Sequence, residues 1–323
     1  MIRVLLTTLL LTVSTLARGG DVITIGETFR VHAAKLQEDR NILLSLPRGY
    51  AGGQERYPVL YLLDGDAHLV HTRGTVDFLA RNGLMPDLII VGIPNTQRTR
   101  DLSPTLGHEL REDGTRVIVA GSGGGEPFLE FIEKTLMPHV ESTYRTQPFR
   151  ILAGHSLGGL LALHTFASHP QLFQGILAAS PALDWDDDYP LRRLETFLRT
   201  KPVLHTTLFV SMADEETGAA RPTRLERVHS LLKGAKVEGS FAWETRKFPE
   251  ENHGSVVLRT HYWGLRKVFE GWRLPADPRT GRFWEGLGGP EGPLREAIPA
   301  AGLPASTSRA GREPGWVSGA GPE

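Results

Sequence analysis

Short apolar runs of strand length alternate with longer segments of helical period between Asp21 and Leu274, and this alternation is the feature that most constrains the fold. The runs lie at 22–32, 41–46, 57–64, 88–93, 151–155, 175–179, 208–212 and 240–248. Several of them are apolar on both faces, as a parallel sheet covered on both sides by helices requires. The sequence therefore predicts an α/β fold, a doubly wound and mostly parallel sheet with helices on both faces.

The segments between these runs supply the predicted helices. Phe128, Ile132, Leu136 and Val140 recur every four residues within 126–144, which gives one apolar stripe on a charged helix. Residues 158–168 are apolar nearly all round, as expected for a helix buried against a central sheet, and a last helix runs to about Gly271. No internal repeat or linker divides this region, so one domain is predicted over 18–274.

The two ends of the chain are expected to lie outside that domain. Arg3 is followed by the apolar run 4–13 and by small residues up to Ala17, which is typical of a secretory signal peptide of residues 1–17. Ten apolar residues are too few for a spanning helix, which needs about 20, so we expect export to the periplasm or medium rather than membrane insertion. Residues 275–323 hold 8 Pro and 10 Gly without a repeat and are predicted to form a mobile tail.

Composition excludes several classes of function. The chain has no cysteine, so it can have no disulfide, thiol nucleophile, iron–sulfur cluster or cysteine-bound zinc. The net charge of −1 provides no global positive field, so neither nucleic acid nor acidic lipid is an expected partner. A small molecule is the expected partner, and no cofactor or metal is predicted.

The segment Gly154-His155-Ser156-Leu157-Gly158 lies between an apolar strand and an apolar helix, which is the setting of the G-x-S-x-G nucleophile turn. A serine in a sharp strand-to-helix turn needs neighbours without a Cβ, and glycines stand at 154 and 158. The turn directs the first N–H groups of the helix at the reaction centre. Ser156 is therefore the predicted nucleophile, and the Leu157 amide is a predicted oxyanion donor.

A serine hydroxyl needs a base, and in this type of fold the order along the chain is nucleophile, acid, histidine. Of the six histidines after Ser156, only His253 lies in a polar, glycine-containing loop that follows the predicted last strand. His253 is therefore the predicted base, whereas His155 is expected to point away from Ser156 and to have a structural role.

The acid is expected just after the run 208–212, where Asp214, Glu215 and Glu216 are consecutive. Successive residues point in different directions, so one of the three is expected to orient the imidazole. Glu215 is favoured, and Asp214 and Glu216 are competitors.

The second oxyanion donor is expected in the loop Asp64-Gly65-Asp66 after the third run, with the Asp66 amide as the candidate. Asp64, Asp66, His68 and His71 are an alternative set of metal ligands, but their spacing matches no established metal signature. The acidic segment 184–188 suggests calcium but lacks the glycine and glutamate of an EF-hand loop. We favour a solvated acidic loop with Trp185 at the rim of the substrate pocket.

In these and several neighbouring motifs, the chain resembles the putative esterase family of α/β-hydrolases, and within it the bacterial siderophore-esterase-like proteins. The resemblance spans about 22–273 and is carried by Tyr-Leu-Leu-Asp-Gly at 61–65, Val-Gly-Ile-Pro-Asn-Thr at 91–96, Arg-Thr-Arg-Asp-Leu-Ser-Pro at 98–104, Tyr-Arg-Thr at 144–146, Gly-His-Ser-Leu-Gly-Gly at 154–159, Ser-Pro at 180–181 and Glu-Asn-His-Gly at 251–254. It implies a serine, histidine and acid mechanism with Ser156 and His253, and a backbone donor after the Asp-Gly pair. It also implies that Trp185 and the segment 98–101 lie near the substrate. Relatives commonly have Gly then Asn-Glu before the acid, where this chain has Ala213-Asp214-Glu215-Glu216, so the acid remains open.

The sequence thus predicts an exported serine esterase, which cleaves siderophore or related aryl and acyl esters. Arg98 and Arg100 are candidates to hold an anionic or phenolic substrate, although a loop paired with Asp101 explains them equally well. Two alternatives remain: an acyltransferase that uses the same three residues, and a non-catalytic binding protein on a hydrolase scaffold.

Overall fold

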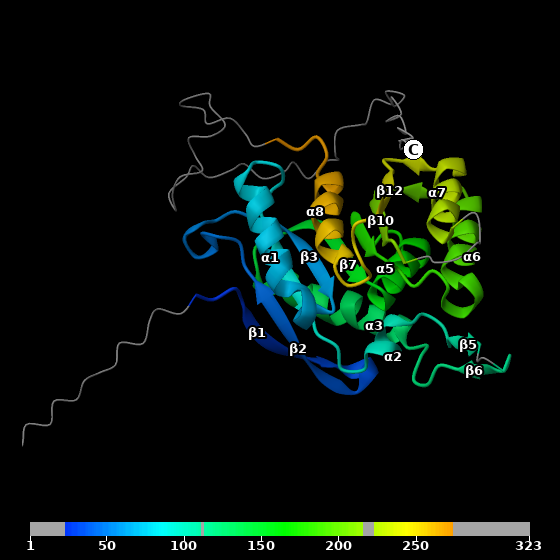
Figure 1. Ribbon diagram of the computed structural model, residues 1–323. Coiled ribbons are helices and arrows are strands. Elements are labelled where there is room, and N and C mark those ends of the chain that lie inside the picture. The colour runs from blue at the N-terminus through cyan, green and yellow to red at the C-terminus, as the bar shows by residue number, and fades with distance from the viewer. Residues whose placement is uncertain (1–22, 111–112, 216–222, 274–323) are drawn as a thin grey trace, which may run out of the picture.

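An eight-stranded sheet forms the centre of the part of the chain that the computed structural model describes, residues 23–110, 113–215 and 223–273 (Figure 1). The predicted signal peptide, the predicted tail and Glu216 lie outside these residues. The strand order is β1-β2-β4-β3-β7-β8-β10-β12. The strands are β1 (Glu27–Ala33), β2 (Glu38–Ser45), β3 (Tyr57–Leu63), β4 (Ile89–Ile93), β7 (Thr146–His155), β8 (Gly175–Ala179), β10 (Thr207–Ala213) and β12 (Ala242–Phe248).

The sheet is antiparallel only where β2 pairs with β1 and β4, and every neighbouring pair from β4 to β12 is parallel. Two small sheets lie outside it. One pairs β5 (His108–Leu110) with β6 (Arg116–Ile118), and the other pairs β9 (Val203–Leu204) with β11 (Glu238–Gly239).

Helices cover both faces of the sheet, so the predicted fold class is confirmed (Figure 1). The helices are α1 (Gly65–Arg81), α2 (Arg98–Leu102), α3 (Gly125–Phe131), η3 (Ile132–Leu136), α4 (Met137–Thr143), α5 (Leu157–Ser168), α6 (Trp185–Arg199), α7 (Arg224–Gly234) and α8 (Val256–Val268), with short turns η1 (Ala34–Leu36) and η2 (Tyr50–Gly52). Side chains alternate along β3: Leu60 and Leu62 pack with α1 and α8, whereas Tyr61 and Leu63 pack with α3, α5 and α6.

Two segments differ from the sequence expectation. The predicted helix over 126–144 exists, but its middle, Ile132–Leu136, is a π-helix. Pro138 follows it at the start of α4, and because proline lacks the N–H that would bond to Lys134, a widened turn fits there. The residues after β3 were expected to form a loop, yet α1 begins at Gly65. Its buried positions include Thr72, so the apolar stripe that would have predicted this helix is weak.

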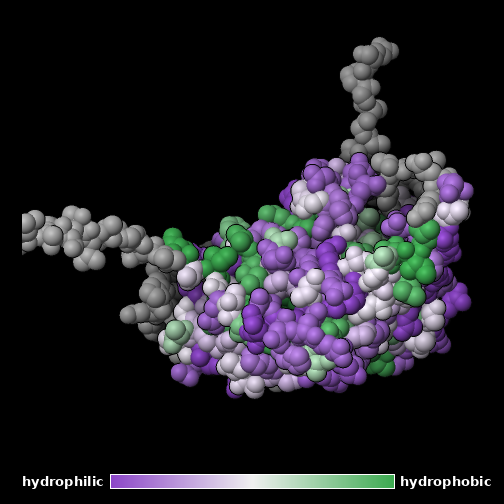
Figure 2. All heavy atoms as spheres, turned by 90° about the horizontal axis from the view of Figure 1, so that it is seen from below, coloured by the Kyte–Doolittle hydropathy of each residue, from purple (hydrophilic) through white to green (hydrophobic). Residues whose placement is uncertain are grey.

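The surface carries scattered apolar side chains. Seen from below the view of Figure 1, they form separate groups among polar residues (Figure 2). The large exposed ones are Ile23, Ile25, Val70, Phe78, Leu106, Ile118, Val203 and Leu258. No helix among the described residues has both the length and the apolar character needed to cross a membrane.

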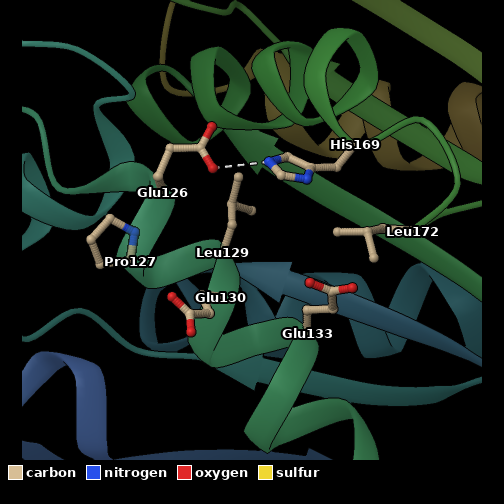
Figure 3. Close-up of a pocket in the computed structure, with 7 residues that line it drawn as sticks. All are labelled: Glu126, Pro127, Leu129, Glu130, Glu133, His169 and Leu172. Atoms are coloured by element: carbon tan, nitrogen blue, oxygen red, sulfur yellow. Dashed lines mark hydrogen bonds and ion pairs between the residues drawn. The ribbon is translucent and has the colours of Figure 1, made fainter.

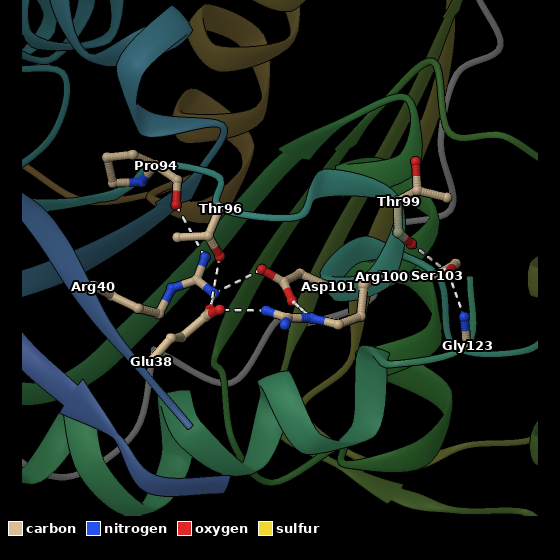
Figure 4. A network of polar contacts seen from close by, with 9 residues as sticks. All are labelled: Glu38, Arg40, Pro94, Thr96, Thr99, Arg100, Asp101, Ser103 and Gly123. Carbon is tan, nitrogen blue, oxygen red and sulfur yellow. Dashed lines mark hydrogen bonds and ion pairs between the residues drawn. The ribbon is translucent and has the colours of Figure 1, made fainter. Parts of the chain in front are cut away.

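A buried ion network joins α2 to β2 (Figure 4). Arg40 on β2 is 1% exposed and donates to Asp101 and Glu38, each at 2.7 Å, and to the Pro94 carbonyl at 3.0 Å. Arg100 bonds to the same two carboxylates, at 2.7 Å to Asp101 and 2.8 Å to Glu38. Burying these charges is tolerable because each is paired several times. The network thereby fixes α2, the short helix that carries Arg98.

A layer of histidines lies between α1 and α8. The rings of His71 and His261 stack with centroids 5.4 Å apart, and a hydrogen bond of 3.1 Å joins His71 to His68. The Thr72 hydroxyl donates to the His68 carbonyl, so it accepts a hydrogen bond from Nδ1–H of His261 at 3.0 Å. Burial, together with the neighbouring His68, lowers the pKa of His71 to about 4, and burial lowers the pKa of His261 well below its usual value.

These neutral imidazoles make the fold sensitive to acid. The unfolded chain takes up protons near pH 6.5, whereas the folded chain resists them until about pH 4, so the free energy of unfolding falls as the pH drops through this window. We expect a loss of at least about 2 kcal/mol between pH 7 and pH 4.5, measured by urea unfolding.

The His71→Gln variant should lose less stability over the same pH range, by about 1 kcal/mol, because it removes one half-buried imidazole. His205→Gln, which removes an exposed histidine, is the control and should follow the original protein. An identical pH dependence in His71→Gln and the original protein would contradict this account.

Candidate active site

The strand-to-helix turn between β7 and α5 holds Ser156 in a strained backbone conformation. Its φ is 59° and its ψ is −116°, a region that side chains rarely occupy. A Cβ at Gly154 would lie 2.2 Å from the carbonyl oxygen of Gly158. The end of β7 and the start of α5 can therefore approach this closely only because residue 154 is glycine. The strained serine and the close glycine contact thus lie in the segment for which the sequence predicts a nucleophile.

The amides of Leu157 and Asp66 lie in the first turns of α5 and α1, where N–H groups have no partner within the helix. These two helices follow β7 and β3, which are neighbouring parallel strands. The helix starts are close, because a Cβ at Gly158 would be 3.1 Å from an oxygen of Asp64. Both predicted oxyanion donors thus lie at the same edge of the sheet.

His253 lies in the loop between β12 and α8, and its Nδ1 forms a hydrogen bond with Glu215. Glu215 follows β10, the parallel neighbour of β12. The side chain of His253 is 49% exposed, and that of Glu215 is 24% exposed. Asp214 is turned away from this pair, since its carboxylate binds Lys247 at 2.6 Å. Of the two described candidate acids, Glu215 is the one in contact with the imidazole.

Ser180 is a site residue that the sequence analysis did not single out for a role. It follows β8, is 1% exposed, and its hydroxyl donates to the second oxygen of Glu215. The same hydroxyl accepts a hydrogen bond of 3.2 Å from the Ala213 amide. Its position in the sheet is the feature that points to it: β8, which Ser180 follows, lies between β7 and β10, the strands that lead to Ser156 and Glu215.

His155 contacts the loop of the candidate base. Its Nε2 donates to the backbone carbonyl of His253 at 2.7 Å, and the two rings lie 4.6 Å apart. Burial, followed by the neighbouring His253, lowers the pKa of His155 to about 4, so this imidazole is neutral near pH 7. The structural role expected for His155 thus includes anchoring residue 253.

The described residues give the Ser156 hydroxyl no hydrogen bond to His253. In enzymes without bound substrate such contacts are often loose and tighten only in the complex. The two residues are nevertheless close in the fold, because His155, the neighbour of Ser156, contacts both the ring and the backbone of His253.

Arg98 lies beside the nucleophile turn. It makes a two-pronged ion pair with Asp64, at 2.7 and 3.0 Å, and donates to the His155 carbonyl at 3.3 Å. Asn95 donates to the same carboxylate at 2.5 Å. Asp64 is 4% exposed, so these donors satisfy a buried charge.

Arg100 and Trp185 have partners within the protein. Arg100 binds Asp101 and Glu38 in the network of Figure 4, so the pairing with Asp101 that the sequence offered as an alternative is present. Trp185 is half-buried and donates from Nε1 to Thr105 at 3.1 Å. Its ring packs against Gly107, where a Cβ would be 2.2 Å from the indole.

The acidic segments are held by cations rather than gathered as metal ligands. Asp64 is paired with Arg98. Asp186, Asp187 and Asp188 are three consecutive residues in the left-handed conformation, and they bind the side chains of His108, Arg116, Arg224 and Arg227. Within the described ranges, neither segment brings three ligand groups together.

Comparison with known proteins identifies the family. The family model described as putative esterase matches residues 33–263. Ferri-bacillibactin esterase of Bacillus subtilis is 33% identical over 217 residues, which cover 62% of this chain and 75% of that protein. Apo-salmochelin esterase of Escherichia coli is 26% identical over 215 residues, which cover 62% of this chain and 65% of that protein.

Solved structures support the same family assignment. An IroE-like serine hydrolase from Shewanella oneidensis has a TM-score of 0.63 and 32% identity, and the match covers 75% of this chain and 79% of that one. The BES protein from Bacillus cereus also has a TM-score of 0.63, with 25% identity, and the match covers 78% of this chain and 99% of that one. The chain therefore belongs to the putative esterase family of carboxylic ester hydrolases, as its sequence motifs predicted.

Proposed function

We propose that the chain hydrolyses its ester substrates through a catalytic triad of Ser156, His253 and Glu215, and that these substrates are siderophore esters or related aryl and acyl esters. The observation that carries the proposal is the hydrogen bond from His253 to Glu215, next to a serine in a strained strand-to-helix turn. Because Glu215 occupies Nδ1, the Nε2 of His253 is the nitrogen left to accept the serine proton.

In the first half of the reaction, Ser156 Oγ attacks the ester carbonyl while His253 Nε2 takes the hydroxyl proton. The carbonyl oxygen becomes an oxyanion, which accepts hydrogen bonds from the amides of Leu157 and Asp66. When the oxyanion collapses, the bond to the alcohol oxygen breaks, and the imidazolium gives its proton to that oxygen. The acyl group remains as an ester on Ser156.

In the second half, water loses a proton to His253 and attacks the acyl-enzyme. Collapse of this second oxyanion releases the carboxylic acid and returns the proton to Ser156. Glu215 stays ionised throughout, because its role is to orient the imidazole and to stabilise its positive charge.

Water is the acceptor that the geometry favours over an alcohol. Acyl transfer to an alcohol requires a site that excludes water. The imidazole of His253 is 49% exposed, so water reaches the position from which it attacks. We therefore place hydrolysis ahead of the acyltransferase alternative.

The substrate class is proposed from the relatives and from two side chains. The Bacillus subtilis and Escherichia coli relatives are described as esterases of bacillibactin and salmochelin. Arg98 is 37% exposed beside the nucleophile turn, and Trp185 offers an aromatic surface. We assign both to contact an anionic or phenolic ester. Arg100 is left out, because two carboxylates already occupy its guanidinium.

The Ser156→Ala variant tests the nucleophile. We expect hydrolysis of p-nitrophenyl acetate and of a catecholate siderophore lactone to fall at least about 10⁴-fold, with the circular dichroism spectrum unchanged. Ser142→Ala removes an exposed serine on α4 and is the matched control. Undiminished hydrolysis by a folded Ser156→Ala protein would refute the triad.

The Ser180→Ala variant tests the support of the acid. Loss of a hydrogen bond to a charged group costs about 1.5–3 kcal/mol, so kcat should fall roughly 10- to 100-fold while KM changes little. Ser211→Ala removes another buried serine, which bonds to Thr260 instead, and should keep its kcat. Equal effects of the two substitutions would show that Ser180 acts only by packing.

We also propose that the chain is exported, because residues 3–17 have the pattern of a secretory signal. Expressed from its natural start in a Gram-negative host, the protein should be recovered from the periplasm or medium with an N-terminus at Arg18. Recovery only from the cytoplasm with residues 1–17 intact would contradict export.

A further inference from the structure

Two histidines converge on one carboxylate far from the active site. The Nε2 atoms of His164 and His169 lie 2.7 Å and 2.9 Å from the two oxygens of Glu126. The ligand atoms of all three residues lie within 4.8 Å of one another. Among the described residues, this is the one group of three or more such side chains gathered in this way. Two imidazoles and a carboxylate are ligands that zinc prefers.

The three side chains come from two elements that pack on the same face of the sheet. His164 lies in α5 and is 5% exposed, and His169 directly follows this helix and is 29% exposed. Glu126 lies at the start of α3 and is 49% exposed. One ligand is thus fixed in the core, and the other two are open to an ion arriving from solvent.

His164 also has the outer partner that a metal-bound imidazole needs. Its Nδ1 lies 2.9 Å from the hydroxyl of Tyr189. A hydroxyl both donates and accepts, so it can donate to Nδ1 while Nε2–H binds Glu126, and accept from Nδ1–H once Nε2 binds a metal. Such partners orient metal-bound histidines and fix their tautomer.

A cavity of about 350 Å³ opens beside Glu126 and His169 (Figure 3). Its lining includes Glu130 and Glu133, which pair with Lys35 at 3.3 Å and with Lys134 at 2.9 Å. Arg193 acts electrostatically on His164, and this positive charge opposes the binding of a cation. The cavity leaves room for a water molecule as a fourth ligand.

We propose that Glu126, His164 and His169 form a binding site for a divalent transition-metal ion of the zinc class. The ion takes Nε2 of each histidine and one oxygen of Glu126, with water from the cavity in the fourth position. Tetrahedral geometry at zinc-to-ligand distances near 2.0–2.1 Å separates ligand atoms by about 3.3 Å. The present separations of 2.7 and 2.9 Å are to different oxygens of Glu126, so the half-exposed carboxylate has to turn to present one oxygen to the ion.

This site is distinct from the proposed triad. Ser156 precedes α5 and His169 follows it, and a helix of 12 residues is about 18 Å long. The bound ion would join α3 to the far end of the helix that carries the oxyanion donor Leu157. Metal binding here and ester hydrolysis are therefore tested separately.

The test is titration of the metal-free full chain with Zn²⁺ by calorimetry, and with Co²⁺ by visible absorption. We expect one equivalent of each ion at this site and the intense visible bands of tetrahedral Co²⁺. His169→Gln and Glu126→Gln change partly exposed side chains and should abolish this equivalent and the bands. Tyr189→Phe should weaken binding by roughly 10- to 100-fold, because it removes the outer partner of His164.

His32→Gln is the matched control, because His32 binds a single carboxylate, Asp39, at 2.7 Å and should leave metal binding unchanged. Circular dichroism should show that each variant is folded. The proposal is overturned if the original protein binds neither ion, or if folded His169→Gln keeps the same stoichiometry and affinity, which would place the ion on other histidines such as His68 and His71.

Discussion

The close approach of Gly154 to Gly158 is the contact on which the arrangement of the site depends. A side chain at residue 154 would overlap the carbonyl of residue 158, so any other residue would force β7 and α5 apart. Only with that approach can Ser156 take its strained conformation with positive φ while the backbone continues directly into the helix. The same turn thus presents the hydroxyl and directs the Leu157 amide toward one point.

The parallel sheet then brings distant residues to one edge, since one group follows each of five neighbouring strands. Asp64, Ser156, Ser180, Glu215 and His253 follow β3, β7, β8, β10 and β12. Neighbouring strands are about 4.8 Å apart, so β12 lies about 14 Å from β7, and the loop of His253 has to reach back across two strands. The hydrogen bond from His155 to the His253 carbonyl holds the loop in that position.

The sequence predicted the fold class and most strands because a parallel strand that is buried on both faces of the sheet needs apolar residues at nearly every position. It also predicted Ser156, His253 and a favoured Glu215, because glycine spacing and chain order constrain a strained turn and its partners. It did not assign Ser180 a role or place His155 against residue 253. Both depend on which strands are neighbours and on side-chain direction, and no local pattern encodes these. It missed α1 as well, since Thr72 and three other polar or charged residues in the first two turns, Asp66, His68 and His71, hide its buried face.

The buried carboxylate of Asp64 raises an electrostatic problem that Arg98 resolves. The oxyanion of the proposed reaction forms near the starts of α1 and α5. Asp64 directly precedes α1, and its carboxylate lies next to Gly158 in the first turn of α5. An unpaired carboxylate about 6 Å from an oxyanion would oppose it by roughly 3 kcal/mol at an effective dielectric constant of 20. Arg98 pairs with both oxygens of Asp64, so the local field is close to neutral beside the proposed oxyanion donors, the amides of Leu157 and Asp66. We infer that Arg98 assists the oxyanion through Asp64 whichever ester is bound, while its exposed part remains available to an anionic substrate.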